Sequence, residues 1–328
     1  MCERSLGVSA VESGTNSCVI AQGYELAAYV HSPYEGGAMP TFHKVLFPVD
    51  LSPRCTDIAP YVAAIAHKFE SELILLHVFG VYDGLAYGEA SPTVIYAAYE
   101  DVIRQRRISE LESFGCEEFK DLKVMRTVEV GDAAHRITQY VDEHKIDLVV
   151  MPTHGRGKFR RLLLGSVTSK VLHDTACPVW TTAHSETVIP QGFQNIRNIV
   201  CAIDSCPDAV RLIHTACDMA NRYGANVCLV HAIPCPEYDD GVLDDAPFKR
   251  FLLETANERI AGLQHEAQTH FDVCVKTGDV AAVVSDVAST CNAQLVVIGR
   301  GRMQEFLGRL RTNANAIIRG APCPVLSV

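Results

Sequence analysis

The stretch Phe47-Pro48-Val49-Asp50 closes a short apolar run, and Cys201-Ala202-Ile203-Asp204 closes a similar run 154 residues later. Further pairs follow in the same order: His77-Val78 with His231-Ala232, Gly131-Asp132 with Gly278-Asp279, and Cys177-Pro178-Val179 with Cys323-Pro324-Val325. The offsets of these three pairs are 154, 147 and 146 residues. So small a drift indicates one domain present twice, with minor length changes in its loops.

The chain of 328 residues is long enough for two domains of ordinary size. We expect residues 1–41 to form a flexible N-terminal extension, 42–185 the first copy, 186–195 a linker and 196–328 the second copy. No apolar run reaches the about 18 to 20 residues of a membrane span, and no secretory signal is recognised. The 13 cysteines are scattered and form no CxxC motif, so we expect a cytoplasmic protein with reduced thiols.

The net charge of −10 argues against a nucleic-acid partner, because neutralising phosphates requires clustered Lys and Arg. One basic cluster nevertheless follows a glycine: Arg156, Lys158, Arg160 and Arg161. On composition alone, such a cluster could equally be a solvated loop or part of an anion site. Its position in the fold has to decide between the two.

Strand and helix signals alternate along each copy. In the first copy we expect strands at 44–50, 73–79, 123–129, 147–151 and 178–182, and helices at 53–70, 92–114, 133–144 and from about 165 onward. Ser52 followed by Pro53 predicts a helix start with a capping hydroxyl. The second copy repeats the strands at 199–203, 226–231, 272–276, 294–298 and 325–328. The pattern predicts an α/β fold of two tandem Rossmann-like domains, each a five-stranded parallel sheet with helices on both faces.

In an open parallel sheet, ligands bind at the carboxyl ends of the strands, where the strand order reverses. Asp50 and the segment that begins at Met151 both lie at such ends. If the first and fourth strands are neighbours, Asp50 faces the loop at Gly155. Its carboxylate could accept hydrogen bonds from a ribose or base, while Gly155 and the helix start at Gly165-Ser166 could offer amides to an anion. The basic cluster would then steer that anion into the crevice.

At these residues the chain resembles the universal stress protein family in its tandem two-domain form. ATP-binding members of that family carry G-x2-G-x9-G-[ST] after the fourth strand. Gly155, nine intervening residues and Gly165-Ser166 match the second part of this motif, whereas Pro152 replaces its first glycine. The resemblance covers both copies from residue 42 onward. It implies adenine nucleotide alpha hydrolase-like domains that bind ATP, alone or with Mg²⁺.

The resemblance also implies roles for individual residues. Asp50 would contact the adenosine part, and Val78 would pack on the adenine. The phosphates would be held by Gly155, Gly165, Ser166 and Val167, and the same pocket would be lined by Pro48, Val49, Met151 and His154.

The second copy departs further from the motif. Gly299 matches the first glycine, but Arg302 stands in place of the second, and Thr312-Asn313 in place of Gly-Ser. We therefore expect a degenerate nucleotide motif. The arginines at 300, 302, 309 and 311 are expected to be solvated by default, with anion binding or pairing to acidic neighbours as the alternatives.

The closing strands of the two copies should be sheet edges, which invite pairing with another strand. The resemblance implies that these strands pair the two copies within one chain. A homodimer of chains is compatible with that arrangement.

No catalytic residue and no metal ligand is predicted. His265-Glu266 and His270 differ from the HExxH motif by one residue, which would turn the imidazoles about 140° apart on a helix. We expect structural roles for His77 and His231, and helix capping by Asp132 and Asp279.

Two functional hypotheses remain. The first is an ATP-binding regulatory or stress-response protein with, at most, slow ATP hydrolysis. The alternative is a nucleotide-free scaffold of the same fold that serves dimerisation and interaction.

Overall fold

The computed structural model describes residues 42–80, 92–153, 164–182, 195–204, 208–234, 246–300 and 309–328. The extension 1–41 and most of the expected linker lie outside these residues. The first copy comprises β1 (Lys44–Pro48), α1 (Pro53–Phe69), β2 (Glu72–Phe79), α2 (Pro92–Ser113), β3 (Val124–Val130), α3 (Ala133–His144), β4 (Leu148–Met151), α4 (Ser166–Asp174) and β5 (Val179–Thr181). The second comprises β6 (Asn198–Ala202), α5 (Ala209–Tyr223), β7 (Asn226–Ile233), α6 (Ala246–Glu266), β8 (Asp272–Thr277), α7 (Val280–Thr290), β9 (Leu295–Ile298), α8 (Arg309–Gly320) and β10 (Val325–Ser327).

These strands form one continuous sheet in the order β3-β2-β1-β4-β5-β10-β9-β6-β7-β8. Neighbours within each copy run parallel, which confirms the two predicted five-stranded parallel sheets. At the centre, β5 and β10 run antiparallel, with Trp180 opposite Leu326. Each closing strand therefore covers the exposed edge of the other. The predicted pairing of the two copies within one chain is confirmed.

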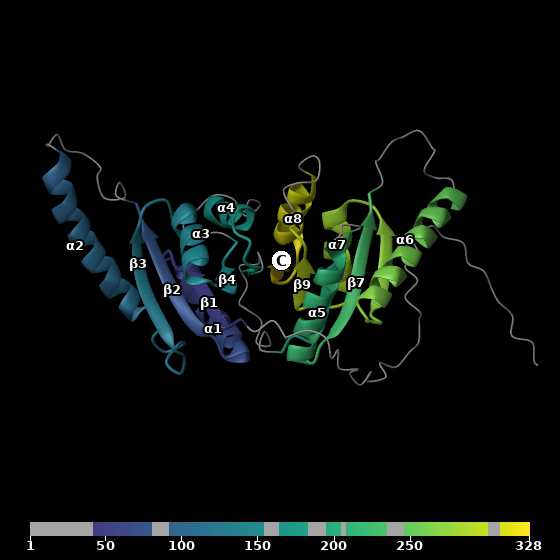
Figure 1. The fold of residues 1–328 in the computed structure, drawn as a ribbon, viewed down its shortest axis with the longest axis horizontal. Helices are drawn as coiled ribbons and strands as arrows, with labels where there is room; N and C mark the ends of the chain where they lie inside the picture. The colour runs from purple at the N-terminus through teal and green to yellow at the C-terminus, as the bar shows by residue number, and fades with distance from the viewer. Residues whose placement is uncertain are drawn as a thin grey trace, which may run out of the picture.

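Helices cover both faces of the sheet. Two large buried clusters lie on opposite faces, one under α1, α2, α5 and α6 and the other under α3, α4, α7 and α8. Leu46 and Phe47 are consecutive in β1 and belong to different clusters, because successive side chains of a strand point to opposite faces. Figure 1 shows α2 and α6 at the two outer ends of the molecule and the C-terminus between the two halves.

The repeated Gly-Asp pairs start equivalent helices. Gly131 and Gly278 both have a φ of 142°, a conformation that strains residues with a side chain. Asp132 then accepts a hydrogen bond of 3.0 Å from the amide of His135, and Asp279 one of 2.9 Å from the amide of Ala282. Both predicted caps are confirmed.

The two copies also meet through the ends of α1 and α5. Lys68 lies over the ring of Tyr223 at 5.1 Å, and Arg222 lies over the ring of Phe69 at 5.5 Å. These are equivalent positions in the two copies, so the contact is reciprocal, as expected at a two-fold axis. Arg222 also donates a hydrogen bond of 2.8 Å from Nε to the carbonyl of Lys68.

Among the described residues, no helix has both the length and the apolar character needed to cross a bilayer.

Candidate functional site

The first and fourth strands are neighbours, as the predicted crevice requires. Leu46 pairs with Val149, and in the same register Pro48 stands level with Met151. From β1 the chain continues to β2 on one side of this pair, and from β4 it continues to β5 on the other side. The strand order therefore reverses between β1 and β4. The structure therefore brings the ends of these two strands, one followed by Asp50 and the other by Pro152, to one point on the sheet edge.

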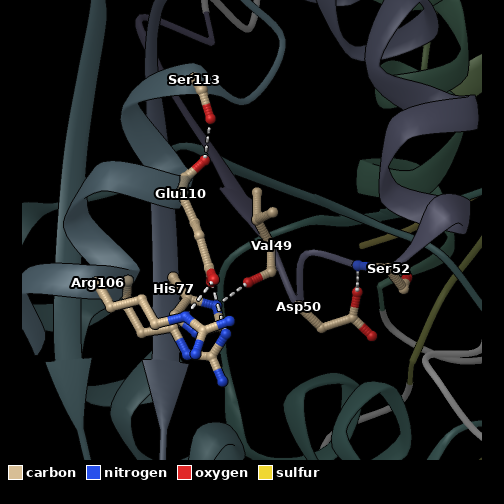
Figure 2. A network of polar contacts seen from close by, with 8 residues as sticks. Val49, Asp50, Ser52, His77, Arg106, Glu110 and Ser113 are labelled. Atoms are coloured by element: carbon tan, nitrogen blue, oxygen red, sulfur yellow. Dashed lines mark hydrogen bonds and ion pairs between the residues drawn. The ribbon is translucent and has the colours of Figure 1, made fainter. Parts of the chain in front are cut away.

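Asp50 organises the turn between β1 and α1. Its Oδ1 accepts a hydrogen bond of 2.9 Å from the amide of Ser52 (Figure 2). The same atom accepts one of 3.1 Å from Sγ of Cys55. The predicted capping by the Ser52 hydroxyl is wrong, because that hydroxyl makes no cap hydrogen bond to α1. A carboxylate has about four lone-pair positions and is an acceptor that suits the hydroxyls of a ligand.

The turn after Asp50 is conformationally strained. Leu51 has a φ of 57°, in the left-handed region that non-glycine residues seldom adopt. Strain of this kind concentrates at functional sites, where surrounding contacts hold it in place. Burial, followed by the charge of Asp50, raises the pKa of the adjoining Cys55 thiol to about 12. Cys55 is therefore a protonated donor to Asp50 at neutral pH.

His77 holds the backbone just before Asp50. Its Nδ1 lies 2.7 Å from the carbonyl oxygen of Val49 (Figure 2), and in the second copy Nδ1 of His231 lies 3.0 Å from that of Ile203. The two imidazoles therefore make the same contact in both copies. This supports the structural role expected for them.

Beside the Asp50 turn lies an ion-pair network on α2. Arg106 and Arg107 both donate to the carboxylate of Glu110, at 2.9 and 2.6 Å (Figure 2). The bond from Arg107 is the main cause of a lowered pKa of Glu110. Arg107 and Glu110 line an open cavity of 470 Å³ together with Leu51. The sequence signal that could have indicated this network is the position of Arg106 and Arg107 four and three residues before Glu110 on the expected helix.

The opposite wall of the crevice is the start of α4. Gly165 precedes the helix with extended backbone, and its amide donates a hydrogen bond of 2.8 Å to the carbonyl of Thr153. Thr168 donates 3.0 Å from Oγ1 to the carbonyl of Pro152. These bonds fix the first turn of α4 against the end of β4. The first amides of a helix have no partner within it, so the turn suits an anion.

Several of the predicted phosphate-side residues cannot be placed. His154, Gly155 and the basic cluster at 156–161 lie outside the described residues. Ser166 is exposed in the first turn of α4, as an anion contact requires.

Pro152 is compatible with the place of the motif glycine. Its counterpart Gly299 does not have a positive φ, and a Cβ there would meet only Cδ2 of Leu212, at an ordinary 3.7 Å. The position therefore needs neither left-handed backbone nor the absence of a side chain. What proline removes is one amide donor.

The predicted apolar residues divide between the two faces of the sheet. Met151 belongs to the cluster on the α3 and α4 side, and Val78 and Val167 pack against that cluster, so all three lie on this face of the sheet. Val49 belongs to the opposite cluster, so only its backbone can face a ligand on the α4 side. Pro48 is buried in β1 two residues after Leu46, so its ring lies on the α4 side of the sheet.

The equivalent crevice of the second copy contains a cavity of 260 Å³. We call it the second-copy cavity; its walls include Ala202, Asp204, His231, Gly299, Arg300 and Asn313. From the sequence we expected only a degenerate nucleotide motif at this place. The retained strand-end residues Asp204 and His231 were the signal that could have indicated it.

Arg300 corrects one prediction. We expected solvation, but its guanidinium reaches the first copy and donates to four carbonyls. Nη1 lies 3.2 Å from the oxygen of Leu172 and 2.8 Å from that of Thr175, and Nη2 lies 3.3 Å from that of Ala176 and 2.6 Å from that of Cys177. Burial lowers the pKa of Arg300 to about 10, so it remains charged at neutral pH. A cation suits the C-terminal end of α4, where carbonyls lack helical partners.

Comparisons with known proteins agree on one family. A family model described as the universal stress protein family matches residues 41–182 and 195–328. A universal stress protein of Mycobacterium tuberculosis strain H37Rv is 31% identical over 193 residues, which cover 56% of this chain and 62% of that protein. The match thus spans less than two thirds of that relative. A universal stress protein of Methanocaldococcus jannaschii is 29% identical over 42% of this chain and 80% of its own length.

A solved structure extends the likeness to both copies. The universal stress protein from Archaeoglobus fulgidus DSM 4304 superposes with a TM-score of 0.60 at 21% identity, covering 88% of this chain and 96% of that chain. At this level of identity the likeness concerns the fold.

Proposed function

This chain belongs to the universal stress protein family, and from that premise we propose that its first copy binds ATP, alone or with Mg²⁺, as a regulatory protein of the stress response. The observation that supports this most is the pairing of β1 with β4, which puts the Asp50 turn and the first turn of α4 at one reversal of strand order. Residues 42–185 would form the nucleotide-binding domain and 196–328 a second domain with a degenerate motif.

Each wall of the crevice would bind a different part of the nucleotide. Asp50 would accept hydrogen bonds from the ribose, and the adenine would lie against the apolar side chains of Val78 and Met151. The triphosphate would carry the negative charge of the ligand. The amides of Gly165, Ser166 and Val167 suit that charge, because a helix N-terminus is electropositive. His154 and Gly155 would complete the phosphate side, as the family motif implies.

The contacts at the two ends of α4 support a regulatory role. Its first turn would hold the phosphates, while its last turn is held by Arg300 from the second copy. A ligand at one end of this helix therefore acts on an element that contacts both copies. We assign no general base, so any hydrolysis of ATP would be slow.

The proposal is tested by looking for the nucleotide. Protein purified under native conditions and denatured in acid should release adenine nucleotide. Isothermal titration of nucleotide-free protein with ATP should give about one site per chain, because only the first copy retains the Gly-Ser start of α4.

A matched pair of charge substitutions locates the site. Gly165→Glu puts a carboxylate where phosphates would bind, and it should weaken ATP binding at least tenfold. Thr312→Glu makes the equivalent change in the second copy and should leave ATP binding unchanged. If neither acid release nor millimolar ATP reveals binding, the nucleotide-free interaction scaffold is the better hypothesis.

A further inference from the structure

The second-copy cavity is mainly apolar, with a few polar groups at its rim. Its walls include the buried side chains of Val230, Val284 and Ile298, and the polar groups around it include Asp204, Asp208 and Arg211. Binding sites for small organic molecules have this composition. The volume of 260 Å³ is slightly below the about 300 Å³ at which pockets for drug-sized ligands begin. The cavity therefore suits a small molecule with an apolar part and a few polar groups.

The phosphate side of this copy is built differently from that of the first. α4 starts at Ser166, directly after Gly165, whereas α8 starts at Arg309, three residues before Thr312. Thr312 and Asn313, which replace Gly-Ser, consequently lie inside the helix. Amides beyond the first turn bond to carbonyls four residues earlier, so they are not available to phosphates.

The charged groups around the cavity also disfavour a triphosphate. Arg300 lies in the wall, but its guanidinium donates hydrogen bonds to four carbonyls of the first copy. Its charge is therefore used at the interface between the copies. Among the described residues of its walls, the other charged side chains are the carboxylates of Asp204 and Asp208 and the exposed Arg211. Two carboxylates repel an anion and accept hydrogen bonds from hydroxyls.

The strand-end residues opposite this side are retained. Asp204 follows β6 as Asp50 follows β1, and His231 makes the backbone contact that His77 makes in the first copy. We propose that the second-copy cavity is a separate site for a non-phosphorylated nucleoside, with the sugar hydroxyls at Asp204 and the base between the apolar walls. This inference rests on the proposed function, because it assigns the adenosine end of the first site to the equivalent residues of the second.

Adenosine is the probe that tests this site. The full chain is first saturated with ATP, which fills the first copy, and adenosine is then titrated calorimetrically. The expected result is one adenosine per chain in the continued presence of ATP. Ala202→Leu adds a side chain to the cavity wall and Asp204→Asn removes the carboxylate charge; each should weaken adenosine binding at least tenfold while ATP binding stays unchanged.

A reciprocal variant serves as the control. Asp50→Asn alters the carboxylate of the first copy and should weaken ATP binding while adenosine still binds to the second. Thermal unfolding of each variant shows whether it is folded, and Asp204→Asn, which keeps the side-chain shape, remains informative if Ala202→Leu does not fold.

Four results would overturn the inference: no adenosine binding at millimolar concentration, two ATP sites per chain, loss of adenosine binding under saturating ATP, or undiminished adenosine binding by both second-copy variants. A chain that binds adenosine at the Ala202-sensitive site but no ATP would contradict the proposed function and support this inference. The two proposals can therefore fail independently.

Discussion

Arg300 of the second copy donates a hydrogen bond of 2.6 Å to the carbonyl of Cys177 in the first. The same guanidinium bonds to three other carbonyls at the end of α4. Replacing Arg300 with alanine would leave partly buried carbonyls without their donor. We expect the free energy of unfolding, measured by urea denaturation, to fall by about 3 kcal/mol.

The control for Arg300→Ala is Arg319→Ala. Arg319 is also on the second copy, but its side chain is exposed, and its Nε donates a hydrogen bond of 3.3 Å to the carbonyl of Asn315 in its own helix. Its loss should change the free energy of unfolding by less than about 0.5 kcal/mol. Equal effects of the two substitutions would contradict the bridging role of Arg300.

Trp180 reports on the joint between the copies, because it is the only tryptophan in the chain and lies in β5. Its indole Nε1 donates a hydrogen bond of 2.8 Å to the hydroxyl of Tyr61, and both side chains are buried. Tyr61→Phe would leave this indole donor without the hydroxyl. The free energy of unfolding, followed by tryptophan fluorescence, should fall by about 2 kcal/mol.

Tyr223→Phe is the matched control, since it removes a hydroxyl but keeps the ring that contacts Phe69 and Lys68. We expect it to cost less than about 0.5 kcal/mol. A Tyr61→Phe variant as stable as the wild type would show that the indole finds another acceptor.

Asp132 makes the stability of α3 dependent on pH. The amide of His135, with a smaller contribution from Lys170, lowers the pKa of this carboxyl. A depressed folded-state pKa stabilises the protein above the unfolded pKa of about 3.9, and the contribution is lost as the pH falls. Asp132→Ala should therefore cost about 1 kcal/mol at pH 7 and less at pH 3, as measured by urea denaturation.

Asp132→Asn separates the charge from the hydrogen bond. Asparagine keeps an acceptor oxygen for the amide of His135 but does not titrate, so this variant should lose less stability than alanine at pH 7. If the cost of Asp132→Ala were the same at pH 7 and pH 3, ionisation of Asp132 would have no part in capping α3.

The thiols should react in an order set by burial. Cys116 is exposed, whereas burial raises the pKa values of Cys55, Cys177 and Cys323 to about 12 each. Since the thiolate is the reactive form, iodoacetamide at pH 8 should modify Cys116 well before these three, as followed by peptide mass spectrometry. Fast modification of Cys177 in the folded protein would mean that the contact between the two copies at Arg300 opens.

The same thiols should make the folded protein less stable at alkaline pH. A raised folded-state pKa stabilises the protein fully below the unfolded value of about 8.5, and this contribution is lost as the pH rises toward 12. The free energy of unfolding should therefore decrease between pH 8.5 and 10.5. Cys55→Ala should reduce that decrease, because it removes one titrating group.

Local patterns predicted most of the fold. The strand and helix periods placed the elements to within a few residues, and α3 at Ala133–His144 matches its expected range. The two Gly-Asp caps were predictable because they depend on the backbone angle of one glycine and on an amide three residues away. Ser52 was misjudged because residue type and position do not fix the direction of a hydroxyl: the helix begins at Pro53 as predicted, but the Ser52 hydroxyl makes no cap hydrogen bond.

The sequence by itself determined that one α/β domain occurs twice, that Asp50 follows a strand and that Gly165 precedes a helix, since such features are encoded within a few neighbouring residues. Only the tertiary structure decided that Arg300 of the second copy binds the carbonyl of Leu172, 128 residues away. The physical reason is that this contact depends on how β5 and β10 dock. Docking brings together groups that no local period or spacing relates.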